Sequence, residues 1–180
     1  ASITEQGQGA EAALAQITAG ALGVAVDDVE VTTGDSAASP YGGGAWASRG
    51  ITIGGEAVWR AARALRENVL RLAGAILQLD AGSLEIRAGV ICDATGAERM
   101  GLAEIAQIGH FRPYLLPEDL QPELTVVRHY VPETGAGNTG VGVQASYLEV
   151  DPATGFVELL GHGVAPECAR LINPLLVEGQ

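Results

Sequence analysis

The chain is organised around residues 41–55, which read Tyr-Gly-Gly-Gly-Ala-Trp-Ala-Ser-Arg-Gly-Ile-Thr-Ile-Gly-Gly. Its three consecutive glycines allow positive φ angles and a close approach of the backbone to a ligand. Ser48 and Arg49 add a hydroxyl and a fixed fork of donors, which suits phosphate or another anion. A helical pattern begins directly after Gly55, and a helix N-terminus adds backbone N–H groups. The stretch predicts either a loop that cradles an anion or a long loop with one exposed arginine.

Two amphipathic helices are predicted on either side of this loop. Before it, apolar residues between Ala13 and Leu22 recur on one helical face, and Gly23 is a natural helix end. After it, apolar residues from Val58 to Ile76 follow steps of three and four. The second pattern is the clearest secondary-structure signal in the chain.

Short strands are predicted for much of the remaining sequence, because polar and apolar residues alternate there. The predicted strands cover residues 27–33, 83–87, 90–92, 124–130, 143–151 and 156–164. The last two are joined by Asp-Pro-Ala-Thr-Gly, a strong hairpin signal. A short helix is predicted around residues 102–108. The fold class is therefore α+β, a mixed α/β architecture in which helices pack on largely antiparallel sheets.

The chain is expected to form two lobes. Residues 111–122 are rich in proline and lack periodicity, which is typical of an irregular connection. The first lobe then covers residues 1–110 and the second residues 123–180. The sequence stops without a closing element, so the second lobe is expected to be incomplete at its C-terminus.

Composition excludes several classes of partner. The formal net charge of −12 at pH 7 disfavours nucleic acid and anionic membrane surfaces. No apolar run reaches the roughly 18 residues that indicate a membrane span. The isolated cysteines, Cys92 and Cys168, fit reduced thiols in a cytoplasmic protein. The histidines are widely separated and lack metal-ligand spacing, so no metal ligands are assigned.

Six short motifs follow one another along the chain. They are Gly7-Gln8-Gly9, Ala15-Gln16-Ile17, Gly34-Asp35-Ser36, Pro40-Tyr41-Gly42, Ser48-Arg49-Gly50 and a tail running from Cys168 through Asn173-Pro174 to Gln180. In this order they resemble the molybdenum hydroxylases. More narrowly, they resemble the large, molybdopterin-binding subunit of aldehyde oxidase, xanthine dehydrogenase and carbon monoxide dehydrogenase-type enzymes. The resemblance covers nearly the whole chain.

The resemblance implies a cofactor, a reaction and partners. The cofactor is molybdopterin carrying molybdenum, in bacteria often in the cytosine dinucleotide form. The reaction is hydroxylation of a small-molecule substrate (an aldehyde, an N-heterocycle or CO) with oxygen derived from water. Electrons leave through iron–sulfur clusters, and usually FAD, on other subunits or domains. The partners are those subunits and the remaining part of the large subunit.

The resemblance also implies which residues bind the cofactor. These residues are Gln8, Gly9, Ser48, Arg49, Cys168, Asn173 and Gln180. The first two match the cofactor-contacting Gly-Gln-Gly loop, and the next two match the loop that borders the phosphate arm. The last three match a later cofactor-contacting turn and its end. That turn is usually Asp-Cys-Gly in the family but Glu167-Cys168-Ala169 here, and alanine tolerates positive φ poorly.

No catalytic residue is assigned within the chain. The family's arginine-bearing active-site loop is expected before residue 1, and its catalytic glutamate, a general base, beyond Gln180. We therefore expect a fragment that is inactive alone, exposes apolar patches and self-associates. The alternative is a non-catalytic module that binds a nucleotide or another anion, or that scaffolds a partner. Coding sequence for the glutamate motif beyond Gln180 would discriminate between the two.

Overall fold

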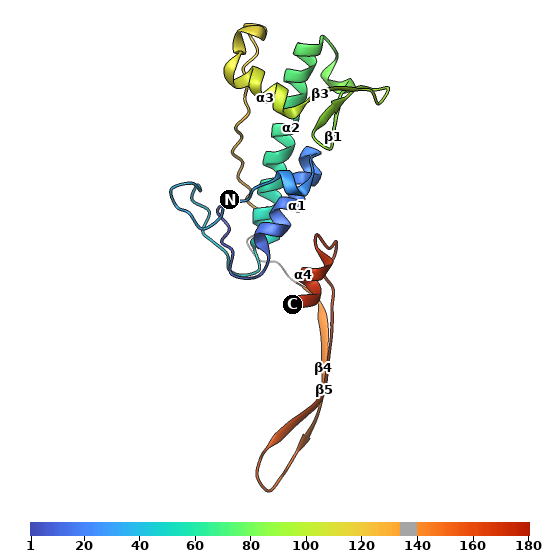
Figure 1. Ribbon diagram of the computed structural model, residues 1–180. Coiled ribbons are helices and arrows are strands. Elements are labelled where there is room, and N and C mark those ends of the chain that lie inside the picture. Colours follow the sequence, from blue (N-terminus) through green and yellow to red (C-terminus); the bar gives the residue numbers. More distant parts are fainter. Residues whose placement is uncertain (134–139) are drawn as a thin grey trace. The chain divides into compact units, whose positions relative to one another are not determined.

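The computed structural model describes residues 1–133 and 140–180 (Figure 1). The chain divides into two units, Ala1–Ala136 and Gly137–Gln180. The first unit contains three α-helices and a small sheet, and the second contains a β-hairpin followed by a short helix. The predicted connection, residues 111–122, lies within the first unit.

A long helix, α2 (Glu56–Leu77), is the central element of the first unit. The helices α1 (Ala10–Leu22) and α3 (Leu102–Phe111) both pack against it, as Figure 1 shows. Three antiparallel strands pair in the order β1-β2-β3 near the C-terminal part of α2. They are β1 (Glu85–Arg87), β2 (Val90–Cys92) and β3 (Glu98–Gly101). Antiparallel pairing together with packed helices confirms the predicted α+β class.

The core of the first unit joins α2, α3 and the three-stranded sheet. Leu72 of α2, Ile91 of β2 and Ile105 of α3 are each at most 1% exposed. Burying side chains of this size contributes about 1.5–3 kcal/mol each to folding. With few aromatic residues available, this core is built mainly from aliphatic side chains.

Two predicted strands are wrong. Val26–Asp28 form a 3₁₀ turn, and residues 29–33 continue without strand pairing in the described part of the chain. Residues 124–130 likewise form no strand. Alternation predicts a pleated segment, but a strand also needs a neighbour that pairs with it. Conversely, β3 was not predicted, because its four residues are too few to show a period.

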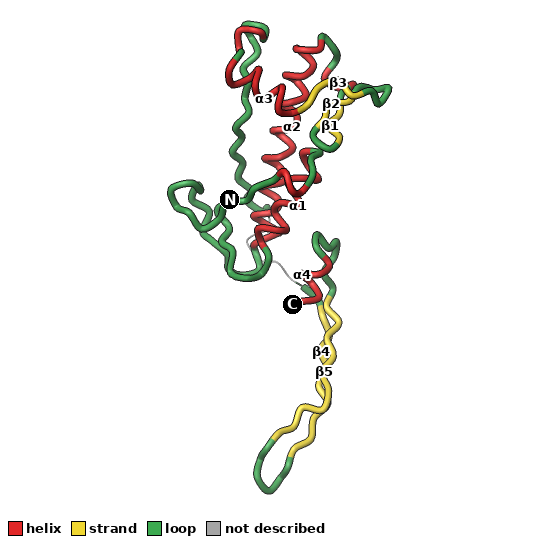
Figure 2. Tube along the Cα trace, viewed as in Figure 1, coloured by secondary structure: helices red, strands yellow, loops and turns green. Residues whose placement is uncertain are grey.

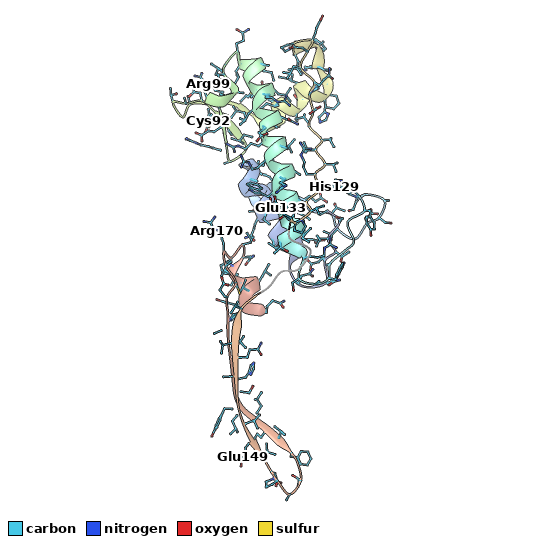
Figure 3. All side chains as sticks on the ribbon, turned by 180° about the vertical axis from the view of Figure 1, so that it is seen from behind. Cys92, Arg99, His129, Glu133, Glu149 and Arg170 are labelled. Atoms are coloured by element: carbon cyan, nitrogen blue, oxygen red, sulfur yellow. The ribbon has the colours of Figure 1, made fainter. Side chains whose placement is uncertain are left out.

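The second unit consists of a long β-hairpin and a helix of six residues (Figure 2). The strands β4 (Gly142–Val150) and β5 (Val157–Pro166) pair antiparallel, close to their predicted bounds. In the turn, the Asp151 carboxylate accepts hydrogen bonds from Ala153 N (2.8 Å) and Thr154 Oγ1 (2.6 Å). Every residue of both strands is exposed, and side chains such as that of Glu149 project outward along the hairpin (Figure 3). The helix α4 (Pro174–Gly179) follows and was not predicted.

The turn between β2 and β3 is organised by a buried carboxylate. Asp93 accepts hydrogen bonds from Thr95 Oγ1 (2.6 Å), Thr95 N (2.8 Å), Ala97 N (3.1 Å) and Arg99 Nε (2.7 Å). Figure 3 shows Arg99 beside Cys92 on this sheet. The bonds from Thr95, and then from Arg99, hold the pKa of Asp93 well below its ordinary value of 3.8. Each of these hydrogen bonds favours the charged form of the carboxylate, so Asp93 is ionised in the folded turn.

We expect Asp93→Asn to lower the melting temperature at neutral pH, because the amide cannot pair with the Arg99 guanidinium as the carboxylate does. A carboxyl group with a depressed pKa stabilises the fold at pH values above its unfolded pKa. That contribution is lost as pH falls through the lower, folded pKa. The gap between wild type and variant should therefore be full above about pH 5 and shrink as pH falls below 3.8. Melting curves measured from pH 7 downward test this, and a gap that widens in acid would contradict it.

Candidate cofactor-binding site

The predicted Gly-Gln-Gly loop lies at the start of α1. Gly9 is the N-cap residue of the helix, with φ 77° in the left-handed region, and Gly7 has φ 90°. The Gln8 side chain is used within the loop, since Nε2 donates to Thr4 O (3.0 Å) and Oε1 accepts from Gln6 N (2.6 Å). These bonds fix the direction of the Gln8 amide. The glycines supply a backbone shape that other residues adopt only with strain.

The second predicted loop lies next to the first. Gln6 Nε2 donates to Ala45 O (3.3 Å), which links the Gly-Gln-Gly loop to residues 41–55. The structure therefore brings Gln8 and Gly9 into the same region of the first unit as Ser48 and Arg49. Two motifs about forty residues apart in sequence contribute to one candidate site.

A strained turn places Arg49. Arg49 N donates to Trp46 O (3.3 Å), and the two residues between them take positive φ angles, 52° at Ala47 and 57° at Ser48. Left-handed conformations at residues other than glycine cost roughly 1–2 kcal/mol each. Such outliers gather at ligand clamps and active sites. The turn is therefore a structural reason to regard this loop as functional.

The Arg49 guanidinium is held on one side and unpaired on another. Its carbon lies 5.3 Å from the centre of the Trp46 ring, and Trp46 Nε1 donates to Gly43 O (2.9 Å). Arg49 Nε is buried and has no hydrogen-bond partner among the described residues. A buried donor left unpaired costs about 1–3 kcal/mol. An anionic group beside this arginine would remove that cost, so the residues present fit the phosphate arm of the implied cofactor.

Glycine is required beside this arginine. A Cβ atom at Gly43 would lie 2.9 Å from Arg49 Nη1, and Gly43 has φ 78°. A larger residue would strain the backbone and would displace the end of the Arg49 side chain from this position. The neighbouring Gly44 has φ 72° but no atom within 4 Å of a built Cβ, so at that position only the backbone conformation favours glycine.

The helix α2 begins directly after Gly55, as predicted, and a π-helical turn precedes it. Residues Gly50–Gly55 form a π-helical turn that leads into α2. The carbonyl of Arg49 accepts hydrogen bonds from Ile53 N (3.0 Å) and Gly54 N (3.3 Å). The π-helical turn therefore starts beside Arg49 and continues into α2. Single π-turns of this kind are frequent at functional sites.

A further polar group was not singled out by the sequence. Gln16 Oε1 of α1 is buried without a hydrogen-bond partner among the described residues. A glutamine within an apolar helix segment is the only signal that could have indicated it. Its motif, Ala15-Gln16-Ile17, contributes to the family resemblance but is not among the predicted cofactor-binding residues.

The remaining predicted residues lie in the second unit. Cys168 is an exposed, free thiol, and the following Ala169 has φ 49°. Asn173 caps α4, because its Oδ1 accepts from Leu175 N (3.1 Å) and Leu176 N (3.4 Å). Gln180 N donates to the carbonyls of Leu176 and Val177 at the end of the same helix. All three residues therefore frame one short turn-and-helix segment.

The part of the chain that the structure describes contains no group of three or more His, Cys, Asp and Glu side chains arranged to hold a metal ion. None of its helices is both long and apolar enough to cross a membrane.

Comparison with known proteins shows which family combines these glycine loops with an arginine whose Nε is buried. Residues 1–180 match the molybdopterin cofactor-binding domain. This chain belongs to that family. The match covers both units, so the family assignment does not depend on one motif.

Relatives of the domain are large subunits of oxidoreductases. The chain is 31% identical over 179 residues to the nicotine 6-hydroxylase large subunit of Paenarthrobacter nicotinovorans, covering 99% of this chain and 22% of that protein. It is 30% identical over 178 residues to the carbon monoxide dehydrogenase large chain of Hydrogenophaga pseudoflava, covering 97% and 21%. The chain thus spans about a fifth of the length of these relatives.

Solved structures of the same kind share the fold. Quinoline 2-oxidoreductase from Pseudomonas putida 86 superposes with a TM-score of 0.84 at 33% identity, over 98% of this chain and 22% of that chain. CO dehydrogenase from Oligotropha carboxidovorans gives a TM-score of 0.82 at 28% identity, over 98% and 22%. The molybdopterin-binding fold class predicted from sequence is confirmed.

The positive φ of Ala169 leads to a prediction. Alanine in the left-handed region is strained by roughly 1 kcal/mol relative to glycine. In the intact protein, Ala169→Gly should therefore raise the free energy of unfolding by up to about 1 kcal/mol, measured by chemical denaturation. Ala153→Gly is the matched control, because Ala153 does not have a positive φ and its change to glycine should only loosen the unfolded chain. A stabilisation by Ala153→Gly equal to that of Ala169→Gly would contradict the explanation.

Proposed function

We propose that this chain holds the anionic arm of molybdopterin within the large subunit of a molybdenum hydroxylase. The observation that carries the proposal is Arg49, whose buried Nε lacks a partner in a glycine-rich loop of a molybdopterin-binding domain. A guanidinium forms two parallel hydrogen bonds to a phosphate, so it both binds and orients the group. The stacked Trp46 ring limits the orientations that the guanidinium can take.

The other candidate residues are proposed as further cofactor-binding groups, considered in each unit separately. In the first unit, Gln8 and Gly9 of the Gly-Gln-Gly loop are proposed to contact the cofactor, and Ser48 adds a hydroxyl beside Arg49. In the second unit Cys168, Asn173 and Gln180 form the later contacting turn. None of these residues is proposed to move a proton or to ligate the metal.

The proposed reaction is hydroxylation of an aldehyde, an N-heterocycle or CO with oxygen derived from water. The bound cofactor supplies the redox centre for that reaction, and this chain binds and orients the cofactor. We further propose the cytosine dinucleotide form, and iron–sulfur and FAD subunits as electron acceptors. The names of relatives support a subunit role, since they include a dehydrogenase complex subunit gamma of Paenarthrobacter nicotinovorans. A cytoplasmic location is part of the same proposal.

Self-association of the isolated chain is proposed as well. Both strands of the β4–β5 hairpin expose large apolar side chains, among them Tyr147 of β4 (72% exposed) and Leu159 of β5 (61% exposed). Contiguous apolar surface of this kind promotes association in water. Light scattering at increasing concentration tests the proposal, and a constant monomer mass would contradict it.

The test of the proposed function is the molybdenum and pterin content of the intact protein that carries this chain, after expression in a host that makes the cofactor. We expect metal and pterin in equal amounts, close to one per protein. The 180-residue chain is assayed in parallel to learn whether it retains the cofactor without the rest of the protein. An intact protein that is folded but free of both molybdenum and pterin would overturn the proposal.

A further inference from the structure

A carboxylate of the chain itself occupies the amide groups at the start of α1. Glu5 Oε1 accepts hydrogen bonds from Gln6 N (3.0 Å), Gly7 N (2.8 Å) and Gly9 N (3.1 Å). Its other oxygen, Oε2, accepts from Glu11 N (3.0 Å) in the first turn of the helix. Four backbone donors, from the loop and the first turn of the helix, therefore converge on one side chain.

This arrangement does the work of a helix cap. The N-cap residue Gly9 has no side chain to accept hydrogen bonds, and the first turn of a helix has N–H groups without intrahelical partners. Glu5 supplies the missing acceptor from four residues upstream, and its charge is favourable at the helix N-terminus. The bond from Glu11, with those from Gly7 and Gly9, lowers the pKa of Glu5 and keeps it ionised.

The bound carboxylate changes what the loop can offer a cofactor. Free backbone amides at the start of a helix are a ready site for the charge of a ligand. The structure engages those of Gly7 and Gly9 with Glu5, so an external phosphate would have to displace a carboxylate to use them. Arg49 Nε, in the adjoining loop, is by contrast without a partner among the described residues.

We propose that Glu5 is a positioning residue, the resident anion that sets the shape of the Gly-Gln-Gly loop and leaves the anionic arm of molybdopterin to Arg49. The link between the loops runs through Gln6, which is adjacent to Glu5 and donates to Ala45 O. A loop that loses Glu5 would release both the amides and this link. The inference rests on the proposed function for its cofactor arm only, because the role of Glu5 in the loop is measurable without cofactor.

The experiment removes the carboxylate and returns it from solution. Glu5→Ala in the intact protein should lower the melting temperature, and added formate should raise it again by filling the vacated amides. Formate should leave the wild-type melting temperature unchanged. Molybdenum retained after dialysis should follow the same pattern, with affinity for the cofactor weakened about tenfold in the variant and recovered in formate. Glu5→Gln keeps the shape of the side chain and one acceptor oxygen, and it replaces Glu5→Ala if that variant does not fold. Its melting temperature and retained molybdenum should lie between those of the wild type and those of Glu5→Ala.

Glu104→Ala is the matched control, since Glu104 also lies in the first turn of a helix and is exposed. Its melting temperature should not respond to formate. A Glu5→Ala protein that keeps wild-type stability and molybdenum, or that formate does not rescue while folded, would overturn the inference. A wild-type protein without molybdenum would refute the proposed function, while the formate response would still report on Glu5.

Discussion

Arg49→Ala should release most of the molybdenum from the intact protein while leaving its fold unchanged. Hydrogen bonds to charged groups contribute about 1.5–3 kcal/mol, which corresponds to roughly a ten- to hundredfold loss of affinity. Folding should change little, because Arg49 Nε makes no hydrogen bond among the described residues and its stacking on Trp46 is partly exposed. Metal and pterin content after dialysis, together with the melting temperature, measure the two effects separately.

Two further variants make this prediction specific. Arg49→Lys keeps the charge but not the planar fork, so it should retain an intermediate amount of cofactor. Arg63→Ala removes another arginine that stacks on a tryptophan, Trp59, at 5.0 Å, and should retain the wild-type amount. Unchanged molybdenum in Arg49→Ala would remove Arg49 from the site. An equal loss in Arg63→Ala would point to a general effect on stability.

Gly23→Ala should destabilise the first unit by about 3 kcal/mol or more. Gly23 ends α1 with φ 91°, and a Cβ atom there would lie 2.4 Å from the carbonyl oxygen of Ile86 in β1. The variant would combine left-handed strain with a clash against backbone, which cannot move aside as a side chain can. The contact also joins α1 to the sheet, because Gly89 N donates to Gly23 O (2.9 Å). Chemical denaturation of the intact protein measures the change.

Two other glycines separate the causes. Gly89 has φ 79° but no atom within 4 Å of a built Cβ, so Gly89→Ala should cost only the strain, about 1 kcal/mol. Gly20 lies within α1 in open space without a positive φ, so Gly20→Ala should stabilise the helix by up to about 1 kcal/mol. Equal losses for Gly23→Ala and Gly89→Ala would show that the clash with Ile86 is absent.

The sequence predicts correctly those elements that are stabilised by interactions between residues close together in the chain. The helix α2 shows an uninterrupted apolar stripe, and the β4–β5 turn carries its own side-chain hydrogen bonds at Asp151. Residues 27–33 and 124–130 alternate like strands but find no pairing partner, which depends on the rest of the chain. The helix α4 was missed although Asn173-Pro174 is a typical N-cap and first position.

The candidate site divides in the same way. The glycine loops and Arg49 were identified because unusual residue types and their order carry the signal. The sequence does not identify Glu5, since its role as an acceptor for the loop amides arises only when the loop folds around its carboxylate. The strain at Ala47 and Ser48 is equally invisible in sequence, because neither residue type favours a positive φ.

The exposed β4–β5 hairpin determines the order in which the parts of this domain become stable. Two strands without a buried face have no core of their own, and an isolated hairpin is at best marginally stable in water. Its amide hydrogens should therefore exchange with solvent far faster than those of α2 and β2, which contribute Leu72 and Ile91 to the core. The domain would then fold in two stages. The first unit folds around its own core, and the hairpin becomes ordered only when other protein surface covers it.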